Sequence, residues 1–169
     1  MHQLHLLRHA KSNWDDSVDD HERPLNRRGR ETARLIGEIL PAGVGSIDLV
    51  LCSSALRTRE TAKLVLAGFA APKILYEDVL YLAGRAALIR RLSQLDEGVG
   101  AVLVIGHNPG LHDLAVGLAA AESPRYRALA TGKFPTTARA SFSVAGAWVR
   151  LGESHHALVA YVTAKSLED

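Results

Sequence analysis

Residues 101–110 read Ala-Val-Leu-Val-Ile-Gly-His-Asn-Pro-Gly and contain the strongest strand signal in the chain. The five apolar residues at 101–105 have the length and the β-branched content of a strand that is buried on both faces. Apolar residues at helical spacing follow at 111–121. A buried strand that leads through a short turn into a helix is typical of an α/β domain with a parallel sheet.

The same alternation of strand-length and helix-length segments continues outward from this stretch. We expect further strands at residues 3–8, 47–52 and 73–76, and helices at 27–40, 56–67 and 86–95, the first of them ending before Pro41. Residues 140–151 and 157–163 are typical of two strands joined through 152–156, and such a hairpin would close one edge of the sheet antiparallel. The sequence therefore predicts an α/β fold, a three-layer α/β/α sandwich with a mostly parallel central sheet and an antiparallel edge near the C-terminus.

The composition narrows the classes of protein that the chain can belong to. With 169 residues, 47% of them hydrophobic, we expect one domain over residues 1–169. The 20 Lys and Arg against 18 Asp and Glu give a net charge of +2, which does not suit a nucleic-acid coat. No apolar run approaches the ~18 residues of a membrane span. The start of the chain lacks the apolar core of a signal peptide and Cys52 is the one cysteine, so we expect a cytoplasmic protein without nucleic-acid or membrane partners. The sequence leaves the oligomeric state open.

Polar motifs follow three of the expected strands. Arg8-His9-Ala10 follows the first, residues 53–61 follow the second, and Gly-His-Asn-Pro-Gly at 106–110 follows the fourth. Ligands of open α/β sheets bind beyond the carboxyl ends of the strands, so we expect these residues to meet in one crevice. Guanidinium groups form paired hydrogen bonds to phosphate oxygens, and neighbouring arginines should lower the pKa of a histidine below its usual ~6.5. A neutral histidine can act as a nucleophile, so the motifs predict a site for a phosphoryl group.

The order and spacing of these motifs resemble the signature of the histidine phosphatase superfamily, also called the phosphoglycerate mutase-like family. Residues 20–29, 133–136 and Trp148 further resemble its small SixA-type phosphohistidine phosphatase branch. The resemblance runs from about residue 4 to residue 165 and implies a phosphoglycerate mutase-like fold, with no metal and no other cofactor. It implies that His9 is a nucleophile that becomes phosphorylated, that Arg8 and Arg57 clamp the phosphoryl oxygens, and that His107 donates a hydrogen bond to them. These four residues are the expected catalytic and phosphate-binding residues.

The chain departs from the family pattern at three positions. Ala10 replaces the common glycine after the nucleophile, and Asp15 stands where relatives that act on sugar phosphates have asparagine, so its carboxylate would repel a phosphate unless it points away. Many relatives have a glutamate that protonates the leaving alkoxide, but residues 81–84 here read Tyr-Leu-Ala-Gly. Glu77 and Asp78 stay open as substitutes. Because general-acid catalysis is worth roughly 10²–10⁴-fold for a basic leaving group, whereas a leaving imidazole can take its proton from solvent, this departure favours a P–N substrate.

The sequence thus predicts a metal-independent phosphohistidine phosphatase that acts on a phosphorylated protein through a phosphohistidine intermediate of its own. The short chain leaves little room for a helical lid, so a phosphohistidine displayed on another protein could enter the crevice. Two alternatives stay open at this point. One is a broad-specificity phosphomonoesterase of the same superfamily that acts on a small phosphorylated substrate, and the other is an inactive module that binds phosphate or a phosphoprotein.

Other conspicuous side chains are expected to have structural roles. Six histidines are expected on solvated faces or in loops: His2, His5, His21, His112, His155 and His156. His107 and His112 do not have the spacing of a helical zinc site, and we expect no metal. Cys52 is expected in the core, because position 58 is Thr rather than the Arg of a cysteine-phosphatase loop. The basic residues at 23, 27, 28, 30 and 34 are expected on a solvated helix face, or alternatively at the border of the crevice, where they could steer an acidic partner.

Overall fold

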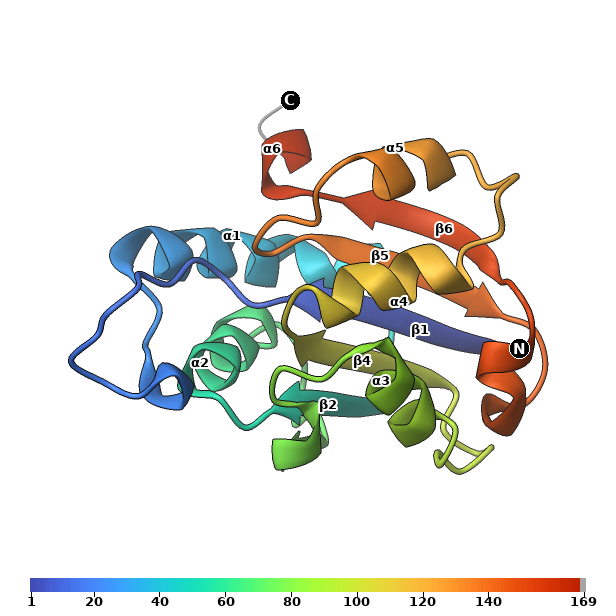
Figure 1. Ribbon diagram of the computed structural model, residues 1–169, viewed down its shortest axis with the longest axis horizontal. Coiled ribbons are helices and arrows are strands. Elements are labelled where there is room, and N and C mark those ends of the chain that lie inside the picture. Colours follow the sequence, from blue (N-terminus) through green and yellow to red (C-terminus); the bar gives the residue numbers. More distant parts are fainter. Residues whose placement is uncertain (168–169) are drawn as a thin grey trace.

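The computed structural model describes residues 1–167 and contains one six-stranded sheet with the strand order β3-β2-β4-β1-β5-β6 (Figure 1). The strands are β1 (His2–Arg8), β2 (Leu49–Ser53), β3 (Ile74–Glu77), β4 (Ala101–Gly106), β5 (Arg139–Val144) and β6 (Ala157–Val162). β1 to β4 are parallel, β5 pairs antiparallel with β1, and β6 pairs antiparallel with β5. The predicted mostly parallel sheet with an antiparallel edge is confirmed.

Helices cover both faces of this sheet. The helices are α1 (Arg27–Val44), α2 (Leu56–Val65), α3 (Arg85–Leu92), α4 (Gly110–Leu118), α5 (Tyr126–Thr131) and α6 (Ala164–Leu167). Three short 3-10 segments lie at Asp20–Glu22, Asp78–Leu80 and Trp148–Glu153. One apolar cluster joins the sheet to α1 and α2, and a second joins it to α3, α4 and α5. The predicted three-layer α/β/α sandwich is therefore confirmed.

Successive residues of the central strands point into these two clusters in turn. Val102 and Val104 of β4 pack on the side of α3 and α4, whereas Leu103 and Ile105 pack on the side of α1 and α2. A strand buried on both faces needs apolar side chains at every position, which explains the unbroken run at 101–105. Cys52 is buried on the side of α1 and α2, in the core as predicted.

α1 continues through Pro41 to Val44 instead of ending before the proline, so the predicted end of this helix is wrong. Proline in a helix removes one backbone hydrogen bond. Here the proline lies in the last turn, where its own carbonyl still accepts a bond from Gly45 N at 2.9 Å and where Val44 is buried. The proline therefore weakens only the last turn of the helix, and the burial of Val44 keeps that turn helical.

The C-terminal third also differs from the prediction at two places. β5 ends at Val144 rather than at 151, because the chain turns at Gly146 with a φ of 88° and then forms a 3-10 segment. This segment buries Trp148, whose Nε1 donates to the carbonyl of Val99 at 2.8 Å. The polar region 122–139, for which we predicted no element, contains the short helix α5.

Gly29 fixes the first turn of α1 against the loop that follows His9. A Cβ atom at Gly29 would lie 2.1 Å from the carbonyl oxygen of Lys11. We expect Gly29→Ala to lower the free energy of unfolding by about 1–3 kcal/mol, measured by urea denaturation, because helix and loop must separate. Gly84→Ala is the matched control, since nothing lies within 4 Å of a Cβ there. Equal stability of the two variants would contradict this account of the packing.

Candidate active site

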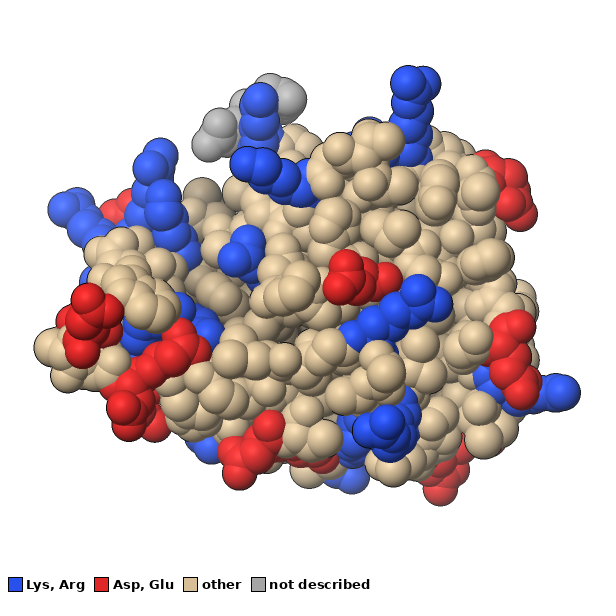
Figure 2. Space-filling model, in the orientation of Figure 1, with Lys and Arg blue, Asp and Glu red and all other residues tan. Residues whose placement is uncertain are grey.

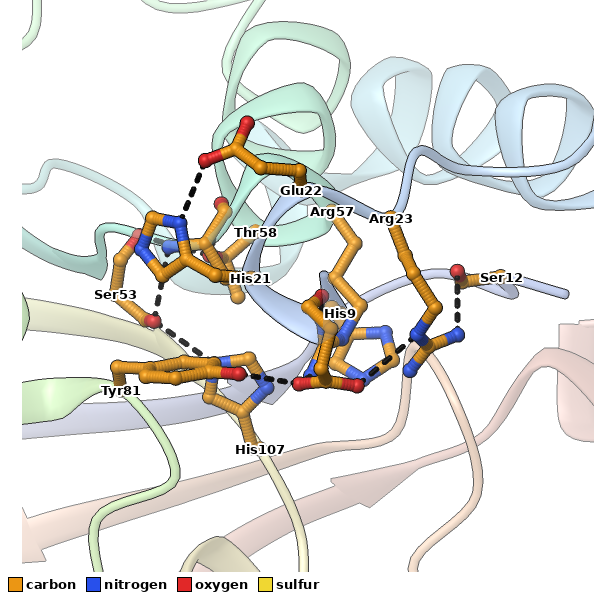
Figure 3. A network of polar contacts seen from close by, with 12 residues as sticks. His9, Ser12, His21, Glu22, Arg23, Ser53, Arg57, Thr58, Tyr81 and His107 are labelled. Atoms are coloured by element: carbon orange, nitrogen blue, oxygen red, sulfur yellow. Dashed lines mark hydrogen bonds and ion pairs between the residues drawn. The ribbon is translucent and has the colours of Figure 1, made fainter. Parts of the chain in front are cut away.

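Residues that follow β1, β2 and β4 meet at one edge of the sheet, because these three strands are neighbours in the order β2-β4-β1. They border a pocket of about 470 Å³. Its lining residues are Arg8, His9, Ser12, Trp14, Asp20, Arg23, Arg57, Leu82, His107, Asn108 and Thr136. The ring centroids of His9 and His107 are 5.4 Å apart, and Figure 3 shows both rings beside Arg57. The structure therefore brings together all four residues that the sequence predicted for the site.

His9 is buried and is held by its own backbone neighbour. Its Nδ1 lies 2.7 Å from the carbonyl oxygen of Ala10, so we assign the ring proton to Nδ1, which leaves the lone pair on Nε2. The backbone N–H of His9 donates to Gly106 O at 3.1 Å, and that of Ala10 donates to Thr61 Oγ1 at 3.0 Å. Ala10 is not among the residues with positive φ, so this turn accepts a residue with a side chain in place of the family glycine.

The pKa values of both site histidines are lowered strongly, which favours their neutral form. Burial, together with the charges of Arg8, Arg57 and Arg23, lowers the pKa of His9 to about 4, although the hydrogen bond to Ala10 opposes this shift. Burial, with the neighbouring His9 and the arginines, lowers the pKa of His107 to about 3. We predicted that the arginines would lower the pKa of His9; they do so, but burial is the largest single cause of the shift. Each ring therefore has an unprotonated nitrogen at neutral pH.

The titration of His9 gives a direct test of this environment. Because its pKa is lowered to about 4, its ring stays neutral as pH falls from about 8 to 5.5 and gains a proton only as pH falls through about 4. We expect the Cε1–H resonance of His9 in NMR spectra, assigned with the His9→Ala variant, to stay nearly constant across that range. A titration midpoint close to the ordinary ~6.5 of histidine would show that the ring is solvated and would refute the assignment.

Three buried N–H groups around His9 have no hydrogen-bond partner within residues 1–167. Nε2 of His107 lies 2.8 Å from Ser53 Oγ, which also accepts from Ala55 N at 3.3 Å. Ser53 is free to donate its hydroxyl proton to Nε2, so we assign the imidazole proton of His107 to Nδ1. That Nδ1, the Nε of Arg8 and the Nε of Arg57 are buried and unpartnered. A buried donor without a partner costs about 1–3 kcal/mol, so three of them at one pocket indicate a site built for an anion.

Asp20 is a member of the site that we did not predict. Its carboxylate accepts hydrogen bonds from Arg23 Nε and Arg57 Nη2, both at 3.0 Å, and from the Tyr81 hydroxyl. Burial disfavours its charge, but the hydrogen bonds from Tyr81, Arg23 and Arg57 outweigh burial and hold the pKa of Asp20 well below its usual range. Asp20 is therefore ionised and positions Arg57, whose Nη1 donates to the Asp20 carbonyl at 2.7 Å. The available signal was its place at the start of the family-like segment 20–29.

The basic residues at 23–34 were expected either on a solvated helix face or at the border of the crevice, and the structure shows examples of both. Arg23 lines the pocket, its side chain is 12% exposed, and its Nη1 donates to Ser12 Oγ at 3.0 Å. Arg27, in contrast, is 88% exposed and pairs with Glu31 on the outer face of α1. One arginine of this cluster thus borders the crevice, while another lies on a solvated helix face.

The carboxylates that stayed open as proton donors do not line the pocket. Glu77 accepts two hydrogen bonds from Arg91, at 2.7 and 3.0 Å, and neither Glu77 nor Asp78 is a lining residue. Asp15 is exposed and accepts from the backbone and the hydroxyl of Ser17, so its charge does not border the pocket either. Asp20 is the one lining carboxylate within the described chain, and as an anion it has no proton to donate.

Two of the six other histidines are buried. The prediction is wrong for His5, which lies within β1, whereas His156 lies in the connection before β6, as predicted, but is not solvated. His5 is 4% exposed with Nδ1 2.7 Å from Ser141 Oγ, and His156 is 3% exposed with Nε2 2.9 Å from Leu151 O. Each has a polar partner, which makes its burial tolerable. Over residues 1–167 no group of three or more His, Cys, Asp or Glu side chains is placed to hold a metal ion. Within the same range no helix has the length and apolar character to cross a membrane.

Comparisons with known proteins give a family match and several similar proteins. The family model for the histidine phosphatase superfamily (branch 1) matches residues 4–80. An uncharacterized protein of Mycobacterium tuberculosis is 39% identical over 161 residues, which cover 92% of this chain and 98% of that protein. An uncharacterized chloroplastic protein of Arabidopsis thaliana is 35% identical over 126 residues, 67% of this chain and 57% of that protein, so the cytoplasmic location stays a prediction.

Solved structures resemble the chain over almost its whole length. A structure provisionally described as the phosphohistidine phosphatase SixA from Nakamurella multipartitia matches with a TM-score of 0.84 and 27% identity, over 96% of this chain and 95% of that chain. The protein histidine phosphatase SixA complexed with tungstate matches with a TM-score of 0.79 and 26% identity, over 98% of this chain and 99% of that chain.

Proposed function

Since the chain belongs to the histidine phosphatase superfamily (branch 1) and has its phosphoglycerate mutase-like fold, we propose that it is a metal-independent phosphohistidine phosphatase acting on a phosphorylated protein. One observation carries this proposal. The unprotonated Nε2 of buried His9 lies in a pocket with three unpartnered N–H donors, on Arg8, Arg57 and His107. A nucleophile surrounded by unused donors is suited to a phosphoryl group. The related SixA structure with tungstate, a tetrahedral oxyanion, supports the same ligand chemistry.

In the first step Nε2 of His9 attacks the phosphorus. A bond forms between Nε2 and phosphorus, and the bond between phosphorus and the nitrogen of the substrate breaks. Arg8, Arg57 and His107 donate hydrogen bonds to the phosphoryl oxygens, and these donors are already in place when charge moves between the two nitrogens. The other ring nitrogen of the substrate takes a proton from solvent before or during this cleavage, so the substrate leaves as a neutral imidazole.

In the second step water hydrolyses the phosphorylated His9. The proton on Nδ1 stays in place throughout, because Nδ1 donates to the carbonyl of Ala10 at 2.7 Å. The phosphorylated ring therefore carries a positive charge, and Nε2 departs as a neutral imidazole when the water oxygen bonds to phosphorus. The water proton passes to solvent or to the released phosphate. Both steps thus have a leaving nitrogen that needs no dedicated acid.

The state of the carboxylates supports a P–N substrate over a phosphomonoester. An alkoxide leaving group needs a proton in the transition state, a contribution of roughly 10²–10⁴-fold. Glu77 is paired with Arg91 outside the pocket, and Asp20 is held as an anion by Arg23, Arg57 and Tyr81. A leaving imidazole is much less basic than an alkoxide. We infer that the lack of a proton donor slows the cleavage of a phosphohistidine little, whereas it slows the cleavage of a sugar phosphate strongly.

The proposed substrate class is tested by comparing leaving groups. We expect kcat/KM for phosphoramidate and for a phosphohistidine peptide to exceed that for a sugar phosphate by on the order of 10²-fold or more. Among phosphate monoesters, an aryl phosphate should react much faster than an alkyl phosphate, because phenolates leave without a proton. Glu77→Gln and Asp78→Asn are controls that should keep the same pattern. Equal turnover of the sugar phosphate would establish the broad phosphomonoesterase instead, and no turnover of any substrate would establish the binding module.

A further inference from the structure

A second hollow adjoins the catalytic pocket and is larger than it. Its volume is about 600 Å³, against about 470 Å³ for the pocket that contains His9. We call it the lysine lobe, and the residues that line it alone are Lys11, His112, Gly132, Lys133, Phe134 and Pro135. Four further residues line both the lobe and the catalytic pocket, namely Arg8, Ser12, Asn108 and Thr136. A phosphoryl group on His9 does not need this space, so the lobe is available to the part of the substrate that bears the phosphoryl group.

The charges of the lysine lobe have one sign. Lys11 and Lys133 are exposed and line it with Arg8, and no Asp or Glu is among its lining residues. Neither lysine forms an ion pair with another residue of the described chain. Figure 2 shows blue Lys and Arg atoms in and around the hollow at the left of the molecule, where β1 and β4 end in Figure 1. The unpaired ammonium groups therefore favour a polar or anionic occupant.

Acidic side chains near the site lie further along the same connection that contains Lys11, on a part of it that does not line the lysine lobe. Asp15, Asp16, Asp19 and Glu22 belong to the connection between β1 and α1, which borders the catalytic pocket through Trp14 and Asp20. No residue of 13–22 lines the lysine lobe. The two sides of the site thus differ in charge, and an acidic segment of a substrate would be attracted to one side and repelled by the other.

The wall of the lysine lobe is packed against the interior and is joined to the catalytic residues. Phe134 is 1% exposed and stacks on His112 and Tyr161, with centroid distances of 5.7 and 6.0 Å. Its carbonyl accepts hydrogen bonds from Arg8 Nη1 at 3.2 Å and from Asn108 Nδ2 at 2.7 Å. A group in this lobe therefore lies against a preformed surface that shares Arg8 with the phosphoryl site.

We propose that the lysine lobe binds acidic residues that flank the phosphohistidine of the substrate protein, with Lys11 and Lys133 as their partners. This inference rests on the proposed function and adds a sequence preference to it. Exposed ion pairs are individually weak. Two such pairs beside a phosphoryl group that is already held in place are enough for the protein to prefer an acidic over a neutral flanking residue. The preference should weaken as salt concentration rises, because the pairs are exposed to solvent.

The test uses three phosphohistidine peptides that differ only in their flanks. One has Glu residues before the phosphohistidine, one has them after it, and one has Gln on both sides. We expect the wild-type protein to prefer one of the acidic peptides over the Gln peptide by roughly ten-fold in kcat/KM, mainly through KM. The double variant Lys11→Glu/Lys133→Glu should lose or reverse this preference. The variant Lys63→Glu/Lys73→Glu has the same net charge with both changes at exposed residues outside both hollows, and it should keep the preference.

Three outcomes would overturn the inference. In the first, the wild-type protein has no preference for an acidic peptide, and in the second, the Lys11/Lys133 variant keeps that preference. In the third, the variant changes kcat/KM only for a small substrate that carries a second anionic group. Fluorescence anisotropy with the same peptides in unphosphorylated form compares their binding without turnover. If no P–N substrate is hydrolysed, the proposed function fails, and the anisotropy ratio alone then confirms or contradicts the acidic preference. The two failures are therefore distinguishable.

Discussion

Replacement of His9 by alanine is expected to lower kcat for phosphoramidate hydrolysis by on the order of 10⁴–10⁶-fold, as removal of the nucleophile does in other covalent hydrolases. The reason is geometric. Nδ1 of His9 is fixed by Ala10, so Nε2 is the atom presented to the pocket with a free lone pair. The other imidazole in the pocket, that of His107, has its Nε2 against Ser53, and we assign its second nitrogen as a donor. The described lining of the pocket therefore offers no second imidazole with a free lone pair to replace His9.

Steady-state turnover and urea denaturation together check this result. His155→Ala is the matched control, because His155 is exposed and lies outside both hollows, and its turnover should stay within about two-fold of wild type. The His9→Ala protein must retain a cooperative unfolding transition for the comparison to report chemistry. A folded His9→Ala protein with more than about a tenth of wild-type kcat would sink the assignment of His9 as nucleophile.

Replacement of Arg57 by alanine is expected to have the second largest effect, a loss on the order of 10²–10³-fold in kcat/KM. The Arg57 side chain is 3% exposed, two of its nitrogens hold Asp20, and its Nε is the unpartnered donor. The variant loses that donor and also leaves the Asp20 carboxylate with less positive charge beside it. An incoming phosphoryl group then meets a less compensated negative charge, so both effects act in the same direction.

Arg59 provides the matched control, two residues further along α2. It is exposed, its guanidinium carbon lies 4.4 Å from the centroid of the Tyr76 ring, and it does not line the pocket. Arg59→Ala removes the same charge from the same helix and should change kcat/KM by less than about three-fold. Equal losses for the two variants would mean that the general positive potential, rather than the hydrogen bond from Arg57, supports the reaction.

The site residues that could be predicted from the sequence are those that come directly after a strand. His9 follows β1 and His107 follows β4, and Arg57 lies in the first turn of the helix after β2. Because the carboxyl ends of parallel neighbours meet, a correct assignment of the strands is enough to bring these residues together. The run at 101–105 could be identified because burial on both faces leaves no polar position in it.

Asp20 was not predictable by the same reasoning, because it follows no strand. It reaches the pocket from a 3-10 turn between β1 and α1, and its partners Arg57 and Tyr81 come from two distant parts of the chain. The burial of His5 likewise depends on Ser141 of a neighbouring strand, and a local pattern does not contain that information. Long-range polar partners decide both cases.

The most direct test of the central claim is a rapid-quench measurement of the phosphorylated protein. Wild-type protein is mixed with phosphoramidate, quenched in alkali during turnover to preserve P–N bonds, and mapped by mass spectrometry of its peptides. We predict one added phosphoryl group on the peptide that contains His9, forming and decaying at rates that account for kcat, and none on His9→Ala protein. A phosphoryl group on another residue, or full turnover with no phosphorylated protein formed at a competent rate, would contradict the account.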